Sequence, residues 1–193
     1  MNKVVDIIDN GGLVIMPTDT IYGIVGDATN EKTIKRVFEL KKRDGSKAML
    51  MLVSDIDMLK EYVDDISEEE TKLIEEFWPG PLTIIFKKKN VSDLLTGGLD
   101  TVGIRCPNDD RLLSIIKELN RPILSTSVNV SGGLQATSID VIDEAIINNV
   151  DYVIDDGECN KVASTIVIVK NKNVKVLREG EIKEIDIINV LKN

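Results

Sequence analysis

The chain has 193 residues, of which 42% are hydrophobic and 30% charged; this balance is typical of a globular protein with one buried core and excludes a disordered or fibrous chain. The net charge of −9 and the low aromatic content of 4% argue against a broad nucleic-acid-binding surface. Because the sequence contains no histidine, Ser-His-Asp triads, Cys-His nucleophiles and histidine metal sites are excluded.

The N-terminal stretch MNKVVDIIDN has neither a targeting nor a membrane-spanning pattern. Asp6 and Asp9 interrupt its apolar residues, no small-residue cleavage site follows, and no apolar run approaches the roughly 20 residues that span a bilayer. The two cysteines, Cys106 and Cys159, form no CxxC pair, so a disulfide framework or a thiolate zinc site has little support. We expect a cytoplasmic protein without membrane association, folded as one domain over residues 1–193 with no C-terminal accessory domain.

Helix and strand patterns alternate along the whole chain, which predicts an α/β fold. Gly11 and Gly12 can end the first helix, Asn30 and Asn108 are placed to cap later helices, and Ser67 with Glu70 forms a capping box. In chain order we predict a helix over 4–8, strand 12–16, helix 30–43, strand 48–53, a helix from 67 to the Trp78-Pro79 stop, strands 83–87 and 101–105, a helix from 108 to 119, strand 122–126, a helix opening at 137–140, strands 151–154, 164–170 and 174–178, and a last helix ending at 191.

The segment PTDTIYGIVGDA, residues 17–28, is predicted to be a loop between a buried strand and a capped helix. Thr18, Asp19 and Thr20 place two hydroxyls and a carboxylate in succession, Tyr22 offers a phenol, and Gly23 permits close backbone approach. The same residue types also suit a β-turn in which Asp and Thr satisfy their own backbone. Taken alone, the segment leaves ligand loop and structural turn equally open.

A basic island follows at the end of the second helix. Residues 31–47 contain seven basic and three acidic side chains in a chain that is acidic overall, and Lys41, Lys42, Arg43 and Lys47 end this run. Guanidinium and ammonium groups suit the phosphates of a nucleotide, and the histidine-free inventory suits phosphoryl or nucleotidyl transfer. The alternative, strongest for Lys42, is a solvated helix end that complements the helix dipole.

Two later motifs carry polar groups on strand patterns. Thr101 and Arg105 lie four residues apart on one strand, so they share one face of the sheet, although a surface ion pair would also explain the arginine. STSVNVSG then places Ser127 and Asn129 at a strand end, where hydroxyl and amide groups can hold a ligand without adding charge, or form an ordinary Asn-Ser-Gly turn.

The segment PTDTIYGIVGDA closely resembles the opening signature PT(D/E)TVYGLGxxA of the YrdC-like family. The resemblance continues through KKRDGSK, WPGPLT, GLDTVGIRCP, STSVNVSG, ASTIV and LREG, in the family's order and over nearly the whole chain. Within the signature, the chain departs from the family's pattern at Ile21, Ile24 and Val25. In the later motifs, Asp44 and Glu179 stand where proline is usual, and Val128 where alanine is usual.

The resemblance implies a twisted open sheet flanked by helices, with a basic central cavity. It implies that ATP, L-threonine and bicarbonate (or CO2) are converted to L-threonylcarbamoyl-AMP and pyrophosphate, with Mg²⁺ accompanying the ATP. This is the first step of threonylcarbamoyladenosine formation in tRNAs that read ANN codons. The product would pass to tRNA-modifying threonylcarbamoyl transferase proteins, while direct tRNA binding stays open.

The resemblance also assigns residues to roles, and it assigns no metal ligand to the protein. The residues it implies are Lys41 and Arg43 for catalysis; Arg43, Lys47, Thr101, Asn129, Thr137 and Arg178 for ATP; Thr20, Arg105, Ser127 and Ser164 for threonine; and Thr18 and Tyr22 for the cavity wall.

Three alternatives remain open. The chain could be a YrdC-like paralogue that uses another carbamoyl or acyl adenylate, as in the carbamoyl-transfer domain of hydrogenase maturation proteins. It could be a paralogue that keeps the pocket without synthase activity, given SVN for SAN and REG for RPG. It could also be a non-catalytic RNA-binding module, which the net charge and the low aromatic content oppose.

Overall fold

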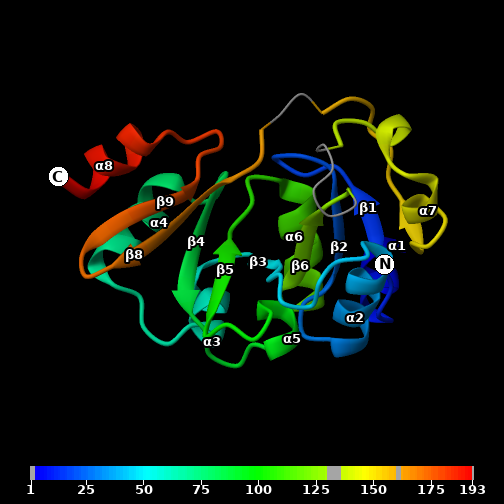
Figure 1. Cartoon of the computed structure of the whole chain (residues 1–193), viewed down its shortest axis with the longest axis horizontal. Helices are drawn as coiled ribbons and strands as arrows, with labels where there is room; N and C mark the ends of the chain where they lie inside the picture. The colour runs from blue at the N-terminus through cyan, green and yellow to red at the C-terminus, as the bar shows by residue number, and fades with distance from the viewer. Residues whose placement is uncertain (1–2, 130–135, 160–161, 193) are drawn as a thin grey trace.

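The computed structural model describes residues 3–129, 136–159 and 162–192. Within these residues one twisted nine-stranded sheet has the order β7-β1-β2-β6-β3-β5-β4-β8-β9, which Figure 1 shows from β9 on the left to β1 on the right. The strands are β1 (Val14–Met16), β2 (Gly23–Asp27), β3 (Leu50–Leu52), β4 (Leu82–Lys87), β5 (Thr101–Arg105), β6 (Ile123–Ser127), β7 (Tyr152–Val153), β8 (Thr165–Lys170) and β9 (Asn173–Arg178). The helices are α1 (Lys3–Asp9), α2 (Glu31–Leu40), α3 (Ile56–Tyr62), α4 (Glu68–Phe77), α5 (Asp93–Thr96), α6 (Asp110–Leu119), the 3₁₀ turn η1 (Ile139–Val141), α7 (Glu144–Ile147) and α8 (Glu184–Lys192).

The sheet is mixed. β1 pairs with β7, β3 with β5 and β4 with β8 in parallel, whereas β1–β2, β2–β6, β3–β6, β4–β5 and β8–β9 are antiparallel. The predicted α/β class and the sheet flanked by helices are confirmed.

Helices cover both faces of the sheet, so its inner strands are apolar on both sides. The alternation is clearest in β1. Val14 and Met16 pack in a cluster with residues of α1 and α6, whereas Ile15 belongs to a second cluster on the other face with residues of α2, α3, α4 and α8. All three side chains are fully buried. Helices α1 and α6 cover only part of the face to which Val14 and Met16 project. The part that they leave uncovered holds the candidate site.

The second half of PTDTIYGIVGDA is a strand and not a loop. β2 pairs with β1 through Val14–Val25 and Met16–Gly23, so only residues 17–22 connect the two strands. Gly23 and Gly26 are the reason that this strand was not predicted, because glycine is disfavoured inside strands unless another group packs closely against it. A side chain at Gly26 would meet Thr33 Cγ2 at 2.7 Å, which is the reason glycine stands there.

The predicted helix boundaries are wrong at three places. α6 is capped by Asp109, whose side chain accepts a hydrogen bond from Leu112 N, and not by Asn108. Helix α2 ends at Leu40, because Lys41 is its C-cap and Lys42 has a φ of 46°. The helix predicted to open at 137–140 is divided into η1 and α7, since Asp143 begins a new cap by accepting from Ala145 N. Helices α3 and α5 were not predicted, whereas the caps at Asn30 and Ser67 are confirmed.

None of the helices in the described part of the chain is long and apolar enough to cross a bilayer. Cys106 and Cys159 are both buried as free thiols.

Candidate functional site

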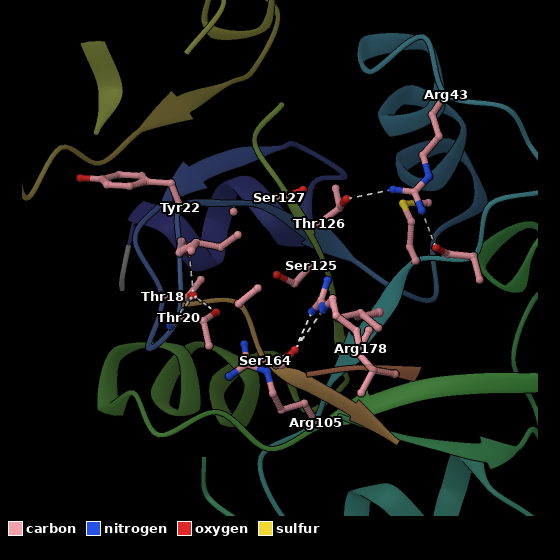
Figure 2. A pocket seen from close by; sticks show the side chains of 17 residues that line it. Thr18, Thr20, Tyr22, Arg43, Arg105, Ser125, Thr126, Ser127, Ser164 and Arg178 are labelled. Carbon is pink, nitrogen blue, oxygen red and sulfur yellow. Dashed lines mark hydrogen bonds between the residues drawn. The ribbon is translucent and has the colours of Figure 1, made fainter. Parts of the chain in front are cut away.

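A cavity of ≈ 200 Å³ lies on one face of the sheet, beneath the loop that joins β1 to β2 (Figure 2). Among the described residues that line it, three are arginines and none is acidic. The lining consists of Thr18, Thr20, Ile21, Tyr22, Gly23, Arg43, Ala48, Met49, Leu50, Arg105, Ser125, Thr126, Ser127, Ala163, Ser164, Ile166 and Arg178.

The pairing of the strands explains why these residues meet. Opposed residues of paired strands project from the same face, and Ser127 is opposed to Gly23, Ser125 to Leu50, and Arg178 to Ile166. Neighbouring strands therefore contribute side chains to one continuous floor. Gly23 keeps this floor open, because a Cβ there would stand 3.2 Å from Ser125 Oγ.

Arg43 reaches the cavity from the residues that follow α2. Its Nη2 donates to the carbonyl of Ala48 at 2.7 Å and its Nη1 to Thr126 Oγ1 at 3.3 Å, while its Nε is buried without a hydrogen-bond partner in the described structure. Burial lowers its pKa. Guanidinium groups with unused donors in such a place are suited to an anion.

Lys41, the C-cap of α2, lies behind Arg43 and is only 1% exposed. Its Nζ donates to Thr126 Oγ1 at 2.9 Å and to the carbonyl of Ser127 at 2.5 Å, so it ties the end of α2 to the end of β6. Burial, and secondarily the charge of Arg43, lower the pKa of Lys41 to about 7. Lys42 is exposed, in agreement with a solvated helix end.

Arg105 ends β5 on the opposite side of the cavity, with Ser125 and Arg178 between it and Arg43 in the view of Figure 2. Its Nη1 lies 2.6 Å from both carboxylate oxygens of Asp19, which belongs to the loop above the cavity. The side chains of this ion pair are 3% and 4% exposed. The Nε of Arg105 is buried and has no partner among the described residues.

Arg178, at the end of β9, is anchored to the residue before β8. Its Nη2 donates to the carbonyl of Ser164 at 2.8 Å and to Ser164 Oγ at 3.2 Å, and Ser164 Oγ also lies 2.9 Å from Thr83 Oγ1. Burial, and secondarily the charge of Arg105, lower the pKa of Arg178. Glu179 turns away from this arginine, because its carboxylate accepts from Glu184 N and Lys183 Nζ at the start of α8.

The hydroxyl groups of the β1–β2 loop hold the loop itself. Thr18 Oγ1 donates to the carbonyl of Ile21 at 2.8 Å, accepts from Thr20 N at 3.1 Å and lies 3.0 Å from Thr20 Oγ1. Structural turn and ligand loop are therefore not exclusive: the turn presents Thr18 and Thr20 to the cavity. The hydroxyl of Tyr22 points away from the other labelled side chains (Figure 2) and donates to the carbonyl of Gly157 at 2.8 Å.

The structure brings most of the predicted site residues together but leaves some outside the lining. The predicted residues that line the cavity are Thr18, Thr20, Tyr22, Arg43, Arg105, Ser127, Ser164 and Arg178, and those that do not are Lys41, Lys47, Thr101, Asn129 and Thr137.

The residues outside the lining are held elsewhere for identifiable reasons. Thr101 shares a face with Arg105 as predicted, but it lies at the other end of β5, about 13 Å away along the strand, and does not line the cavity. Lys47 is exposed in the turn after Arg43. Asn129 lies next to the lining, where its Oδ1 accepts from Ser127 Oγ at 2.6 Å, and the backbone carbonyl of Thr137 accepts from Cys159 N. Residues 130–133 of the predicted SVNVSGG stretch lie outside the described residues.

The sequence did not predict Ser125 and Thr126 in the lining, nor the ion pair between Asp19 and Arg105. The period-2 alternation of β6 places Ser125 and Ser127 on one face. Because the strand pattern predicts a buried core strand, it does not indicate that these hydroxyls line a cavity. The tight ion pair of Asp19 joins residues 86 positions apart, which no local pattern indicates. The described residues contain no group of three or more Cys, Asp or Glu side chains that could hold a metal ion.

Known proteins resemble the chain in sequence and in fold. The family model described as telomere recombination, for the Sua5/YciO/YrdC domain, matches residues 6–180. A protein of Methanocaldococcus jannaschii is 40% identical over 178 residues, which are 90% of this chain and 82% of that protein. The threonylcarbamoyl-AMP synthase of Aliivibrio fischeri is 30% identical over 183 residues, 93% of this chain and 98% of the relative.

Among solved structures, Pyrococcus abyssi Sua5 complexed with L-threonine superposes with a TM-score of 0.91 at 34% identity. The match covers 97% of this chain and 56% of that one, so the chain spans about half the length of this relative. Escherichia coli YciO shares the fold, with a TM-score of 0.83 at 23% identity. The match over residues 6–180 and the identity to full-length relatives establish that the chain belongs to the Sua5/YciO/YrdC family.

Proposed function

We propose that the chain joins L-threonine, bicarbonate and ATP into L-threonylcarbamoyl-AMP and pyrophosphate. The observation that carries the proposal is the convergence of Arg43, Arg105 and Arg178 with a set of hydroxyl groups in one cavity, whose described lining contains no carboxylate. Family members carry the name of this activity, and one is solved with L-threonine. The triphosphate of ATP, bicarbonate and the carboxylate group of threonine are negatively charged and match a cavity of this charge.

The chemistry requires positioning more than a protein nucleophile. The neutral amine of threonine adds to CO2 with loss of a proton, or reacts with bicarbonate with loss of water, to give a carbamate. A carbamate oxygen then attacks the α-phosphorus of ATP, and pyrophosphate leaves as the bond to the β-phosphate breaks. Both new bonds form between substrates, so the protein supplies orientation and charge stabilisation. In our proposal Arg105 binds the carboxylate of threonine, and Arg43 and Arg178 stabilise the charge that moves onto the phosphates. Lys41 supports the same region from behind Arg43.

Hydroxyl groups are proposed to select threonine. Thr20, Ser127 and Ser164 line the cavity around the proposed carboxylate site and can pair with the amine and the hydroxyl of the substrate. A site that hydrogen-bonds the substrate hydroxyl discriminates strongly against analogues that lack it, because the polar groups of the site would then stay unpaired. Valine, which replaces that hydroxyl by a methyl group, should therefore be a poor substrate.

The volume and the lining limit how ATP and Mg²⁺ can enter. A cavity of ≈ 200 Å³ is smaller than the roughly 300–1,000 Å³ of pockets that enclose whole drug-sized ligands, so only part of the nucleotide fits inside. Because the described lining offers no carboxylate, we propose that Mg²⁺ arrives as MgATP, bound by phosphate oxygens and water. We further propose that the protein acts in the cytoplasm and passes its product to a tRNA-modifying transferase. The net charge of −9 disfavours the RNA-binding alternative.

The test is to incubate the protein with MgATP, bicarbonate and single amino acids, and to follow pyrophosphate release. We expect release that depends on both threonine and bicarbonate and falls at least about tenfold with valine. Release independent of threonine would overturn the proposal and favour a paralogue using another acyl group. Binding of tRNA that falls steeply with salt, without pyrophosphate release, would favour the RNA-binding module.

A further inference from the structure

Asp19 is a buried carboxylate that none of the substrate-binding roles proposed above uses. It is 8% exposed and projects from the β1–β2 loop across the sheet face toward the end of β5. Both of its oxygens accept from Arg105 Nη1 at 2.6 Å, and Oδ2 also accepts from the backbone N–H of Asn108 at 2.9 Å. The carboxylate is thus fixed from two directions, by a side chain and by the backbone after β5.

The bond to Asp19 uses only one end of the Arg105 guanidinium. A guanidinium group has five N–H donors in a planar fork, and Nε together with Nη2 forms the edge suited to bidentate binding of a carboxylate. Since Nη1 is turned to Asp19, this edge is directed elsewhere, and Nε is buried with no partner among the described residues. A buried donor without a partner costs stability, so a ligand that accepts from it would bind strongly.

We propose that Asp19 is a positioning residue: it holds Arg105 so that the Nε–Nη2 edge faces the cavity and receives the carboxylate of the amino-acid substrate. This inference rests on the proposed function, and it assigns Asp19 no contact with substrate.

The charges in the cavity support the same role. Arg105 and Arg178 are close enough for the charge of Arg105 to contribute to the lowered pKa of Arg178. Two neighbouring buried cations repel each other, and Asp19 offsets part of that repulsion from behind Arg105. With Asp19 in place, the three lining arginines still leave the cavity positively charged, as an anionic substrate requires.

A purely structural role for Asp19 is the main competing explanation, because the same bonds tie the β1–β2 loop to the segment after β5. Asp27 provides a matched control for that role. It is 5% exposed, it accepts from Arg121 Nε at 2.7 Å, and it lies outside the cavity lining. Asp27→Asn also removes the charge of a buried aspartate from an ion pair with arginine, although its partner Arg121 is 27% exposed and Arg105 only 3%.

The kinetic test compares Asp19→Asn, Asp19→Glu and Asp27→Asn with the wild type. Asp19→Asn should raise KM for threonine by about tenfold to a hundredfold, the effect of weakening one charged hydrogen-bonding group, and change KM for ATP by less than about twofold. Asp19→Glu keeps the charge and should recover part of the affinity for threonine. Asp27→Asn should lower the melting temperature and leave KM for threonine unchanged. An active Asp19→Asn variant with wild-type KM for threonine would overturn the proposal.

A spectroscopic test decides the role of Asp19 even when turnover fails. In the wild type, the ¹⁵N NMR signals of the Arg105 side chain, assigned with an Arg105→Lys variant, should show slow rotation of a guanidinium held at Nη1. Asp19→Asn should make this rotation fast, whereas Asp27→Asn should not. Slow rotation that persists in Asp19→Asn would contradict the positioning role. Absence of threonine-dependent turnover in the wild type would instead contradict the proposed function, so the two failures are distinguishable.

Discussion

The face of the sheet that carries the cavity has two regions, which meet at β6. One region is packed with apolar side chains beneath α1 and α6, and the other lines the cavity. Ile123, in the first region, is fully buried in the cluster beneath α1 and α6, whereas Ser125, two residues further along the same face, lines the cavity. β3 also contributes to both regions, since Leu52 packs in the apolar cluster and Leu50 lines the cavity. A shift of two residues along a strand therefore separates the packed region from the binding region.

The two regions make opposite contributions to stability. The region beneath α1 and α6 removes apolar surface from water, which stabilises the fold at about 25 cal/mol per Å². The cavity region keeps guanidinium groups buried with Nε donors unpartnered on Arg43 and Arg105, which costs stability until a ligand binds. Substitutions on the two sides should consequently separate loss of stability from loss of activity.

The largest expected effect is on stability, from Ile116→Ala in α6. Ile116 is fully buried between α6 and the sheet, so truncating it should lower the free energy of unfolding by about 2–5 kcal/mol. Urea unfolding measures this loss, and the exposed Lys117→Ala on the same helix is the control. Turnover per folded molecule should stay at the wild-type level. A large loss of turnover in folded Ile116→Ala would show that the two regions are not independent.

Arg43→Ala, in the cavity region, should instead lower turnover strongly and stability only slightly. The variant loses the guanidinium proposed to stabilise phosphate charge, so threonine-dependent pyrophosphate release should fall by at least about tenfold. It also loses two hydrogen bonds, one of them long, which should cost no more than about 1–2 kcal/mol in the free energy of unfolding. Lys42→Ala, an exposed neighbour, should retain activity. Wild-type turnover in Arg43→Ala would remove this arginine from the proposed mechanism.

Gly23→Ala should have a smaller effect on the kinetics, because the added methyl group narrows the cavity. The added Cβ would stand 3.2 Å from Ser125 Oγ and 3.5 Å from Thr18 Cγ2, so it narrows the floor without a clash against backbone. We expect KM for threonine to rise about three- to tenfold with little change in melting temperature. Gly45→Ala is the matched control, because a Cβ there meets nothing within 4 Å. Equal kinetics for the two variants would mean that substrate does not approach Gly23.

The sequence was informative about the fold wherever a local pattern decides the structure, and less so where distant contacts decide it. The caps at Asn30 and Ser67 are local and were predicted correctly. The extent of β2 was missed, because Gly23 and Gly26 are tolerated in this strand only through packing that the sequence does not display. The Asp19–Arg105 ion pair was missed for the same reason.

For the site, the resemblance located the three arginines and some of the hydroxyls of the lining but could not show which basic side chains are buried. Periodicity places Lys41 and Arg43 in one basic run, and only the packing of α2 against β6 separates their environments. Lys41 is turned inward to Thr126 and Ser127, whereas Arg43 lines the cavity.

The last expected effect concerns the pH dependence of stability, to which the buried Lys41, bonded to the end of β6, should contribute. The pKa of Lys41 falls from 10.5 to about 7 in the folded protein, because burial disfavours the charged amine. Between these two values the unfolded chain binds the proton and the folded chain does not, so this residue makes stability rise with pH from about 7 to about 10. A neutral amine keeps two N–H donors, enough for its bonds to Thr126 and Ser127.

Lys41→Met should therefore be more stable relative to the wild type at about pH 6 than at about pH 9, because the variant has no charge to desolvate at low pH. Urea unfolding of both proteins across this range measures the difference, with Lys42→Met as the control for loss of one exposed charge. A difference between Lys41→Met and wild type that does not change with pH would show that Lys41 stays charged in the folded protein. Its ammonium would then be held by Thr126 and Ser127 as a permanent cation behind Arg43, in addition to the three arginines that line the cavity.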